Sequence, residues 1–102
     1  MSEILHINDE TFDQTVNSDT TVFVDFWAPW CTYCRRIAPA VDQVAGQYGE
    51  QMVVGKVNVD EQPELAGQFG VMSIPTLVVM KDGKVVQQAV GVRPKAQILS
   101  ML

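Results

Sequence analysis

The order of apolar segments in residues 21–59 constrains the fold of this 102-residue chain more than any other feature. Thr21 to Phe26 is a run of β-branched and aromatic residues, typical of a strand buried on both faces. Residues 31–48 place apolar side chains at steps of three and four, the spacing of an amphipathic helix, and Met52 to Val59 is a second strand-like run. Because two strands joined by a helical crossover pair in parallel, this segment predicts a βαβ unit.

The remaining segments extend this unit into a mixed sheet flanked by helices. Asp82-Gly83 is a strong hairpin signal, so the strands on either side of Lys81-Asp82-Gly83 should be antiparallel. The other expected elements are a strand at Ile4 to Ile7, a helix capped by Asn8 or Asp9 that runs toward Val16, a helix from Pro63 to about Phe69, strands at Thr76 to Met80 and Lys84 to Val90, and a helix from Pro94 to Leu102.

Turn and breaker residues mark the limits of these elements. Residues 17–20 read as a loop, and Trp27 to Trp30 reads as a short connector. Gly49 is expected to end the long helix, and Pro39 is expected to kink it. Since no linker, repeat or low-complexity segment interrupts the pattern, residues 1–102 are expected to form one domain.

Composition excludes several classes of function. Twelve acidic side chains against seven basic ones give a net charge of −5, which argues against a nucleic-acid binder. Leu77 to Met80 is among the longest apolar runs and is far shorter than the roughly 20 residues of a membrane span. Residues 1–34 hold no lysine or arginine, so a secretory signal is not expected, and the sequence predicts a cytoplasmic protein.

The candidate chemistry lies in Trp30-Cys31-Thr32-Tyr33-Cys34. Two cysteines three residues apart at the start of a helix share one face, within reach of a disulfide. In a reducing compartment such a pair is more often catalytic or metal-binding than structural. The free N–H groups and positive dipole end of the helix favour a thiolate on Cys31, which makes it the candidate nucleophile. Cys34, one turn further in, suits the role of resolving cysteine.

Two cysteines can also serve in a metal site or in a protease dyad. A structural zinc site needs about four ligands, and the only other candidate, His6, is distant in sequence and expected to face solvent. We therefore expect no metal site within the chain. An iron–sulfur cluster held by four cysteines of a dimer stays open. A cysteine-protease dyad would need a histidine near the cysteines.

Motifs along nearly the whole chain, in order and with similar spacing, resemble the thioredoxin family. They are Val24-Asp25-Phe26-Trp27-Ala28-Pro29-Trp30-Cys31-x-x-Cys34, Ile37-Ala38-Pro39, Asn58-Val59-Asp60, Ile74-Pro75-Thr76 and Lys81-Asp82-Gly83. The resemblance implies a thioredoxin fold, an α/β fold whose central mixed sheet has about five strands flanked by about four helices. It also implies a monomer that reduces protein disulfides through the Cys31–Cys34 disulfide, without a bound cofactor. Electrons would come from a separate flavoprotein reductase.

The same resemblance suggests roles for further residues. Burial of Asp25 in an apolar strand would raise its pKa, and the family implies that it accepts the proton of Cys34; a carboxylate at a strand end in solvent is the alternative. Lys56 would lie near Asp25 and tune the ionisation of that carboxyl group. The alternative is that Lys56 lies at a strand edge and reaches water. The Ile74–Pro75 bond would be cis and place the Ile74 backbone beside Cys31. The expected substrate contacts are Trp30, Thr32, Tyr33, Ile74, Gly91 and Val92. Trp27 is interpreted as a packing residue.

Two other functions fit parts of the pattern. Cys-x-Tyr-Cys is similar to glutaredoxins, which would make the protein glutathione-dependent or oxidising, but those usually have Pro at the position of Thr32 and lack the Trp-Ala-Pro-Trp stretch. A non-catalytic docking module is the second alternative. The presence of Cys31, Cys34, Asp25 and Pro75 argues against it.

The Thr32-Tyr33 dipeptide should make this protein a stronger oxidant than a family member with Gly-Pro between the cysteines. Tyr33 restores a backbone N–H that Pro lacks, which favours the thiolate and hence the reduced form. One good hydrogen bond is worth about 1.4 kcal/mol, or roughly 30 mV for a two-electron couple. Equilibration with a glutathione buffer should therefore give the wild type a less negative potential than the Thr32→Gly, Tyr33→Pro double variant. An equal or more negative wild-type potential would refute this effect.

Overall fold

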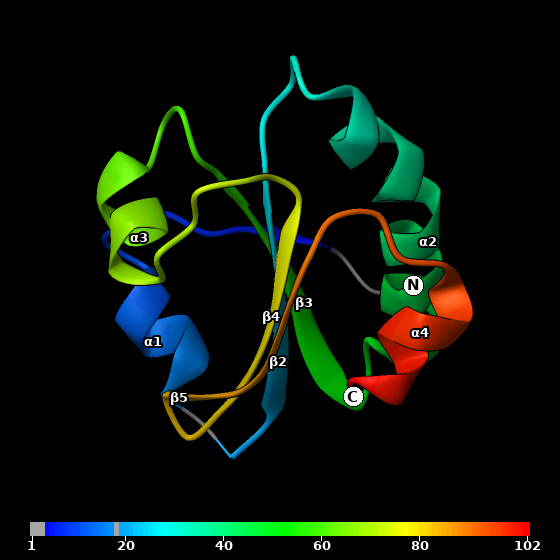
Figure 1. Cartoon of the computed structure of the whole chain (residues 1–102). Coiled ribbons are helices and arrows are strands. Elements are labelled where there is room, and N and C mark those ends of the chain that lie inside the picture. Colours follow the sequence, from blue (N-terminus) through cyan, green and yellow to red (C-terminus); the bar gives the residue numbers. More distant parts are fainter. Residues whose placement is uncertain (1–3, 18) are drawn as a thin grey trace.

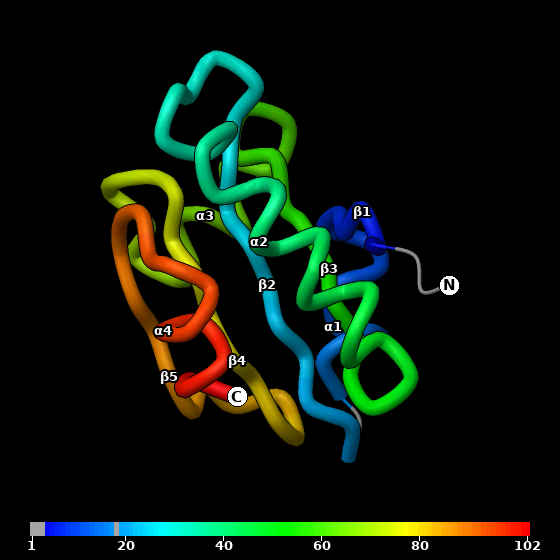
Figure 2. The backbone as a smooth tube through the Cα atoms, turned by 90° about the vertical axis from the view of Figure 1, so that its right-hand side faces the viewer, coloured from blue at the N-terminus to red at the C-terminus, as the bar shows by residue number. Residues whose placement is uncertain are grey.

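A five-stranded mixed sheet lies at the centre of the computed structural model, which describes residues 4–17 and 19–102. The elements in chain order are β1 (Leu5–His6), α1 (Phe12–Val16), β2 (Thr21–Trp27), α2 (Thr32–Tyr48), β3 (Met52–Asn58), α3 (Pro63–Gln68), β4 (Thr76–Lys81), β5 (Lys84–Val90) and α4 (Lys95–Ser100). The strand order is β1-β3-β2-β4-β5, which Figure 2 shows across the width of the molecule. This architecture is the thioredoxin fold expected from the sequence.

Strand pairing confirms both predicted supersecondary units. β2 pairs in parallel with β3, from Thr21 opposite Met52 to Trp27 opposite Asn58, so β2, α2 and β3 form the βαβ unit. β4 is antiparallel to β2 on the other side and antiparallel to β5. The β4–β5 hairpin turns at Asp82-Gly83, where φ is 54° and 75°, the positive values that this tight turn requires.

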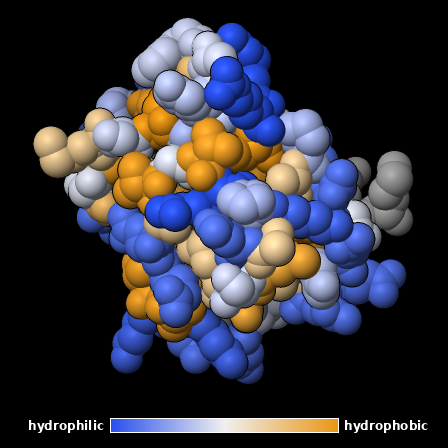
Figure 3. Space-filling model, turned by 45° about the vertical axis from the view of Figure 1, so that its right-hand side comes forward, coloured by the Kyte–Doolittle hydropathy of each residue, from blue (hydrophilic) through white to orange (hydrophobic). Residues whose placement is uncertain are grey.

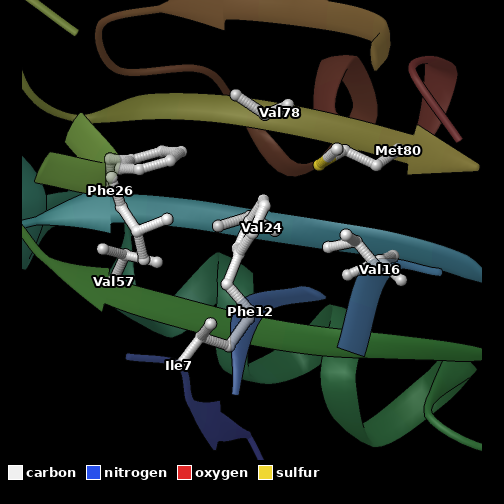
Figure 4. Close-up of a cluster of buried hydrophobic side chains, with 10 residues drawn as sticks. Ile7, Phe12, Val16, Val24, Phe26, Val57, Val78 and Met80 are labelled. Carbon is white, nitrogen blue, oxygen red and sulfur yellow. The ribbon is translucent and has the colours of Figure 1, made fainter. Parts of the chain in front are cut away.

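Helices cover both faces of the sheet: α1 and α3 lie on one side, and α2 and α4 lie on the other (Figure 1). Alternation along β2 directs Val22, Val24 and Phe26 toward α1 and α3, where they pack in the cluster of Figure 4. Phe23 points to the opposite face and packs with apolar residues of α2 and α4. Asp25 shares that second face, so the alternation places a carboxyl group on the α2 side of the sheet.

Several predicted boundaries were wrong by a few residues. The helix cap expected at Asn8 or Asp9 is Thr11, and α1 begins at Phe12. The Asn8 side chain accepts hydrogen bonds from the N–H groups of Glu10 and Thr11 and forms a turn before α1. Trp27 belongs to β2 rather than to a connector, since it continues the pairing with β3.

The ends of other elements differ by smaller amounts. The first strand, expected at Ile4 to Ile7, covers only Leu5–His6. The last helix, expected from Pro94 to Leu102, covers Lys95–Ser100. Gly49 ends α2 as predicted, with its N–H bonded to the Ala45 carbonyl, and Pro39 lies inside α2. Of the predicted loop 17–20, Ser18 lies outside the described residues. No helix within residues 4–17 and 19–102 is long and apolar enough to cross a membrane.

Two glycines should respond in opposite directions to replacement by alanine. Gly55 in β3 lies against β1, and a Cβ there would collide with the side chain of Ile7, which is buried in the core. Gly55→Ala should therefore destabilise the fold by about 1–3 kcal/mol. Gly46 in α2 has open space around its Cα, so Gly46→Ala should stabilise by about 0.5–1 kcal/mol. Urea unfolding of both variants measures the difference, and a Gly55→Ala protein as stable as Gly46→Ala would contradict the close approach of β1.

Candidate active site

Cys31 and Cys34 form a disulfide at the start of α2. Their Cα atoms are 5.2 Å apart. Cys31 is the N-cap of the helix with an extended backbone, and its Sγ accepts a hydrogen bond of 3.1 Å from the N–H of Cys34. A sulfur atom thus takes the place of the side-chain oxygen that usually caps a helix. The N–H group and the positive end of the helix dipole both favour negative charge on this sulfur.

The two cysteines are almost equally buried in the disulfide form. Cys31 is 5% exposed and Cys34 is 3% exposed. The difference between them lies in their surroundings. Cys31 lines a surface pocket of about 430 Å³, whereas Cys34 does not. Cys31 is therefore the cysteine that faces this opening.

Residues far from the cysteines in sequence complete the pocket. Its lining residues come from the start of α2 and from the loop before β4, and they are Trp30, Cys31, Thr32, Tyr33, Met72, Ser73 and Ile74. Four of the residues expected at the substrate surface are among them. The sequence prediction did not include Met72 and Ser73 among the site residues. Both lie in a loop, and a loop has no hydrophobic periodicity from which its position in the fold could be predicted.

Exposed aromatic side chains stand on the α2 side of this pocket. Trp30 is 65% exposed, and its Nε1 donates a 2.7 Å hydrogen bond to Asp60, a residue that sequence reasoning did not assign to the site. Tyr33 is 57% exposed, with the guanidinium of Arg36 5.5 Å from its ring centroid. Figure 3, which brings the side of α2 and α4 forward, shows hydrophobic patches separated by hydrophilic surface.

The loop before β4 brings backbone groups beside Cys31. The Ile74–Pro75 peptide bond is cis, as the resemblance implied, and the carbonyl oxygen of Ile74 lies 3.8 Å from Cys31 Sγ. Gly91, with φ of 94°, donates its N–H to the carbonyl of Pro75 at 2.8 Å. Gly91 and the exposed Val92 therefore adjoin this loop, although neither lines the pocket.

Asp25 is a buried carboxyl group on the α2 side of β2. It is 1% exposed, and its Oδ1 has no hydrogen-bond partner, so the alternative of a solvent-exposed carboxylate is wrong. Burial raises its pKa to about 6; the charge of Lys56, opposite Asp25 in the β2–β3 register, lowers the pKa, and the charge of Asp42 raises it. The Lys56 Nζ also lies 5.6 Å from the ring centroid of Trp27.

Side chains that could bind a metal ion do not cluster in the part of the chain that the structure describes. No group of three or more His, Cys, Asp or Glu side chains there could hold an ion. His6 is exposed on β1, as predicted. Trp27 packs with the cysteines, which agrees with its interpretation as a packing residue, while its buried Nε1 has no partner.

Comparison with known proteins finds relatives along the whole chain. Residues 3–102 match the family model described as Thioredoxin. Thioredoxin from Haemophilus influenzae is 47% identical over 103 residues, covering 100% of this chain and 96% of that protein. Thioredoxin 1 from Synechococcus elongatus is 50% identical over 103 residues, with the same two coverages. The crystal structure of Malassezia sympodialis thioredoxin (Mala s 13) is similar with a TM-score of 0.91 at 30% identity, covering 99% of this chain and 90% of that one.

Asp25 should make the stability of the fold depend on pH. Between pH 3.8 and about 6 the folded state holds a proton on Asp25 that the unfolded state has released, so stability falls as pH rises through this window. The full difference is roughly 3 kcal/mol. Asp25→Asn nearly preserves shape and removes the charge, so the variant should match the wild type near pH 4 and exceed it in stability above about pH 6. Urea unfolding from pH 4 to 8 measures this difference.

Lys56→Met provides the matched control for this effect. Without the lysine charge, which lowers the pKa of Asp25, the fall in stability should extend to higher pH than in the wild type. A stability difference between wild type and Asp25→Asn that stays constant across the whole range would contradict the burial of an ionising carboxyl group.

Proposed function

The chain belongs to the thioredoxin family, and from that premise we propose that it is a protein-disulfide reductase that receives its electrons from a separate flavoprotein reductase. Thiol–disulfide oxidoreductase activity follows from the family together with the Cys31–Cys34 disulfide. The direction of electron flow, the donor and the role of each residue belong to the proposal. The observation that carries it is the hydrogen bond from the Cys34 N–H to Cys31 Sγ, which favours a thiolate on Cys31.

The proposed reaction proceeds by two exchanges of sulfur atoms. The Cys31 thiolate attacks one sulfur of the substrate disulfide, forms a mixed disulfide, and displaces the other substrate sulfur as a thiolate that takes up a proton. Cys34 then loses its proton and attacks the Cys31 sulfur. This step forms the Cys31–Cys34 disulfide and releases the second substrate thiol. The substrate gains two electrons, and the cysteine pair loses them.

Asp25 is the proposed acceptor of the Cys34 proton. Its pKa of about 6 supports this role, since a group that changes charge near neutral pH can both take up and release a proton under working conditions. Lys56 would tune that exchange, because its charge favours the ionised form of Asp25. Both proposed roles depend on the burial of Asp25 and on its electrostatic interaction with Lys56.

Substrate binding is proposed to use the backbone beside Cys31 and the surface around it. An extended substrate segment could pair with the backbone at Ile74, next to the cis-Pro75 bond. Gly91, without a side chain, would allow close approach of a partner backbone. The other proposed contacts are Trp30, Thr32, Tyr33 and Val92.

The setting of the reaction is also part of the proposal. We expect residues 1–102 to work as a single-domain cytoplasmic monomer on disulfide-containing proteins, with no bound cofactor beyond its own disulfide. The net charge of −5 argues against nucleic acid as a partner, because the phosphates would be repelled.

A coupled assay tests the proposed direction and donor. Insulin disulfides, NADPH and a thioredoxin reductase should give NADPH oxidation that depends on this protein. Turnover only with glutathione, glutathione reductase and NADPH would favour the glutaredoxin-like alternative. No turnover in either system would favour a docking module.

Substitution of each cysteine should separate the two steps. Cys34→Ser should accumulate mixed disulfides with substrate proteins, because the resolving attack is lost, whereas Cys31→Ser should capture almost none. Non-reducing gels followed by mass spectrometry of the trapped bond measure the outcome. Equal trapping by both variants would show that the proposed order of attack is wrong.

A further inference from the structure

Met72 lies at the rim of the Cys31 pocket with almost no cover. It is 96% exposed, more than any other large hydrophobic residue in the described ranges. Trp30 and Tyr33, which line the same pocket, are also exposed, so the three side chains form one exposed apolar surface beside Cys31. A contiguous apolar surface of this kind is typical of an interaction site.

Neighbouring residues hold the backbone of Met72 in this outward position. Val71 packs against the core cluster on the α1 and α3 side of the sheet, and Ile74 packs against the cysteines. The hydroxyl of buried Thr76 donates a 2.6 Å hydrogen bond to the Ser73 carbonyl. Because the loop is anchored on both sides of residue 72, the position of Met72 is fixed while its unbranched side chain can adapt to different partners.

The pocket beside Met72 favours an apolar occupant. None of its lining residues is charged, and Trp30 and Tyr33 present large rings on the α2 side. A large apolar side chain of a substrate would bury surface there against Met72 and these rings, and this burial is favourable. The pocket also contains Cys31, so its occupant must be a part of the substrate close to the attacked sulfur.

The geometry of an extended substrate indicates which residue this is. A cysteine that faces Cys31 lies next to Ile74, whose carbonyl oxygen is 3.8 Å from Cys31 Sγ. Side chains alternate along an extended chain, so the residue two positions from that cysteine points to the same side, about 7 Å away. Met72 lines the same pocket as Cys31 and Ile74. A side chain that enters this pocket from that position of the substrate would therefore contact Met72.

We propose that Met72 makes this site select protein disulfides whose attacked cysteine has a large apolar residue two positions away. The inference rests on the proposed disulfide-reductase function and names its substrate class. Met72 is a specificity residue: it contacts the substrate chain and leaves the sulfur chemistry unchanged. Its effect therefore falls on the substrate concentration at half-saturation and not on the maximum rate.

The test compares two disulfide-linked peptide dimers that differ only in having Leu or Gln two positions before and after the cysteine. Each is mixed with the reduced protein in single turnover, and the rate is divided by that of dithiothreitol with the same peptide. The wild type should prefer the Leu peptide about tenfold, equivalent to ~1.4 kcal/mol. Met72→Gln should lower the preference to about twofold by raising the half-saturation concentration, since the apolar contact is lost.

Two variants control for trivial effects. Met72→Leu restores an apolar side chain and should keep the preference, whereas Val86→Gln changes an exposed valine of β5 outside the pocket and should leave it unaltered. Equal use of both peptides by the wild type, or a preference that survives Met72→Gln, would overturn the role of Met72 alone. Failure of the wild type to reduce either peptide would overturn the reductase function as well.

Discussion

Strand β2 is paired along both edges and covered on both faces, and the geometry of the redox site follows from that position. β3 and β4 fix its register, and the helices on either side fix the direction of its side chains. The chain that leaves β2 must turn before α2 can pack over the sheet. Cys31 lies at this turn and caps the helix, and Cys34 lies one turn further in. Asp25, in the same strand, is carried into the interior below α2.

The fold favours negative charge on one group of the site, the Cys31 sulfur, and disfavours it on another, the Asp25 carboxyl group. The helix start offers an N–H to Cys31 Sγ at no cost, because this group has no partner within the helix. The carboxyl group of Asp25 instead loses hydration, keeps one oxygen unpartnered and is only partly compensated by Lys56. A cost of this kind inside an otherwise apolar sheet is typical of functional residues. Stability and the proposed proton transfer therefore oppose each other at Asp25.

Local patterns predicted the strand–helix–strand unit, the hairpin and the cysteines at a helix start, because each depends on periodicity or turn residues within a short segment. Features that depend on distant contacts were missed. The turn before α1 is held in part by a hydrogen bond from the Asp9 N–H to the Gln62 side chain, and Trp27 joins β2 through its pairing with Asn58. Met72 reaches the cysteines only because the loop before β4 folds beside the start of α2. No single segment of sequence contains these contacts.

The central claim is that the start of α2 makes Cys31 the attacking thiolate. Its most direct measurement is the rate at which iodoacetamide modifies each cysteine of the reduced protein as a function of pH, with the modified residue assigned by mass spectrometry. Cys31 should react first, with a half-maximal rate at a pH clearly below the value of about 8.5 usual for a free cysteine. Modification of Cys34 first, or an ordinary pH dependence for Cys31, would contradict the claim.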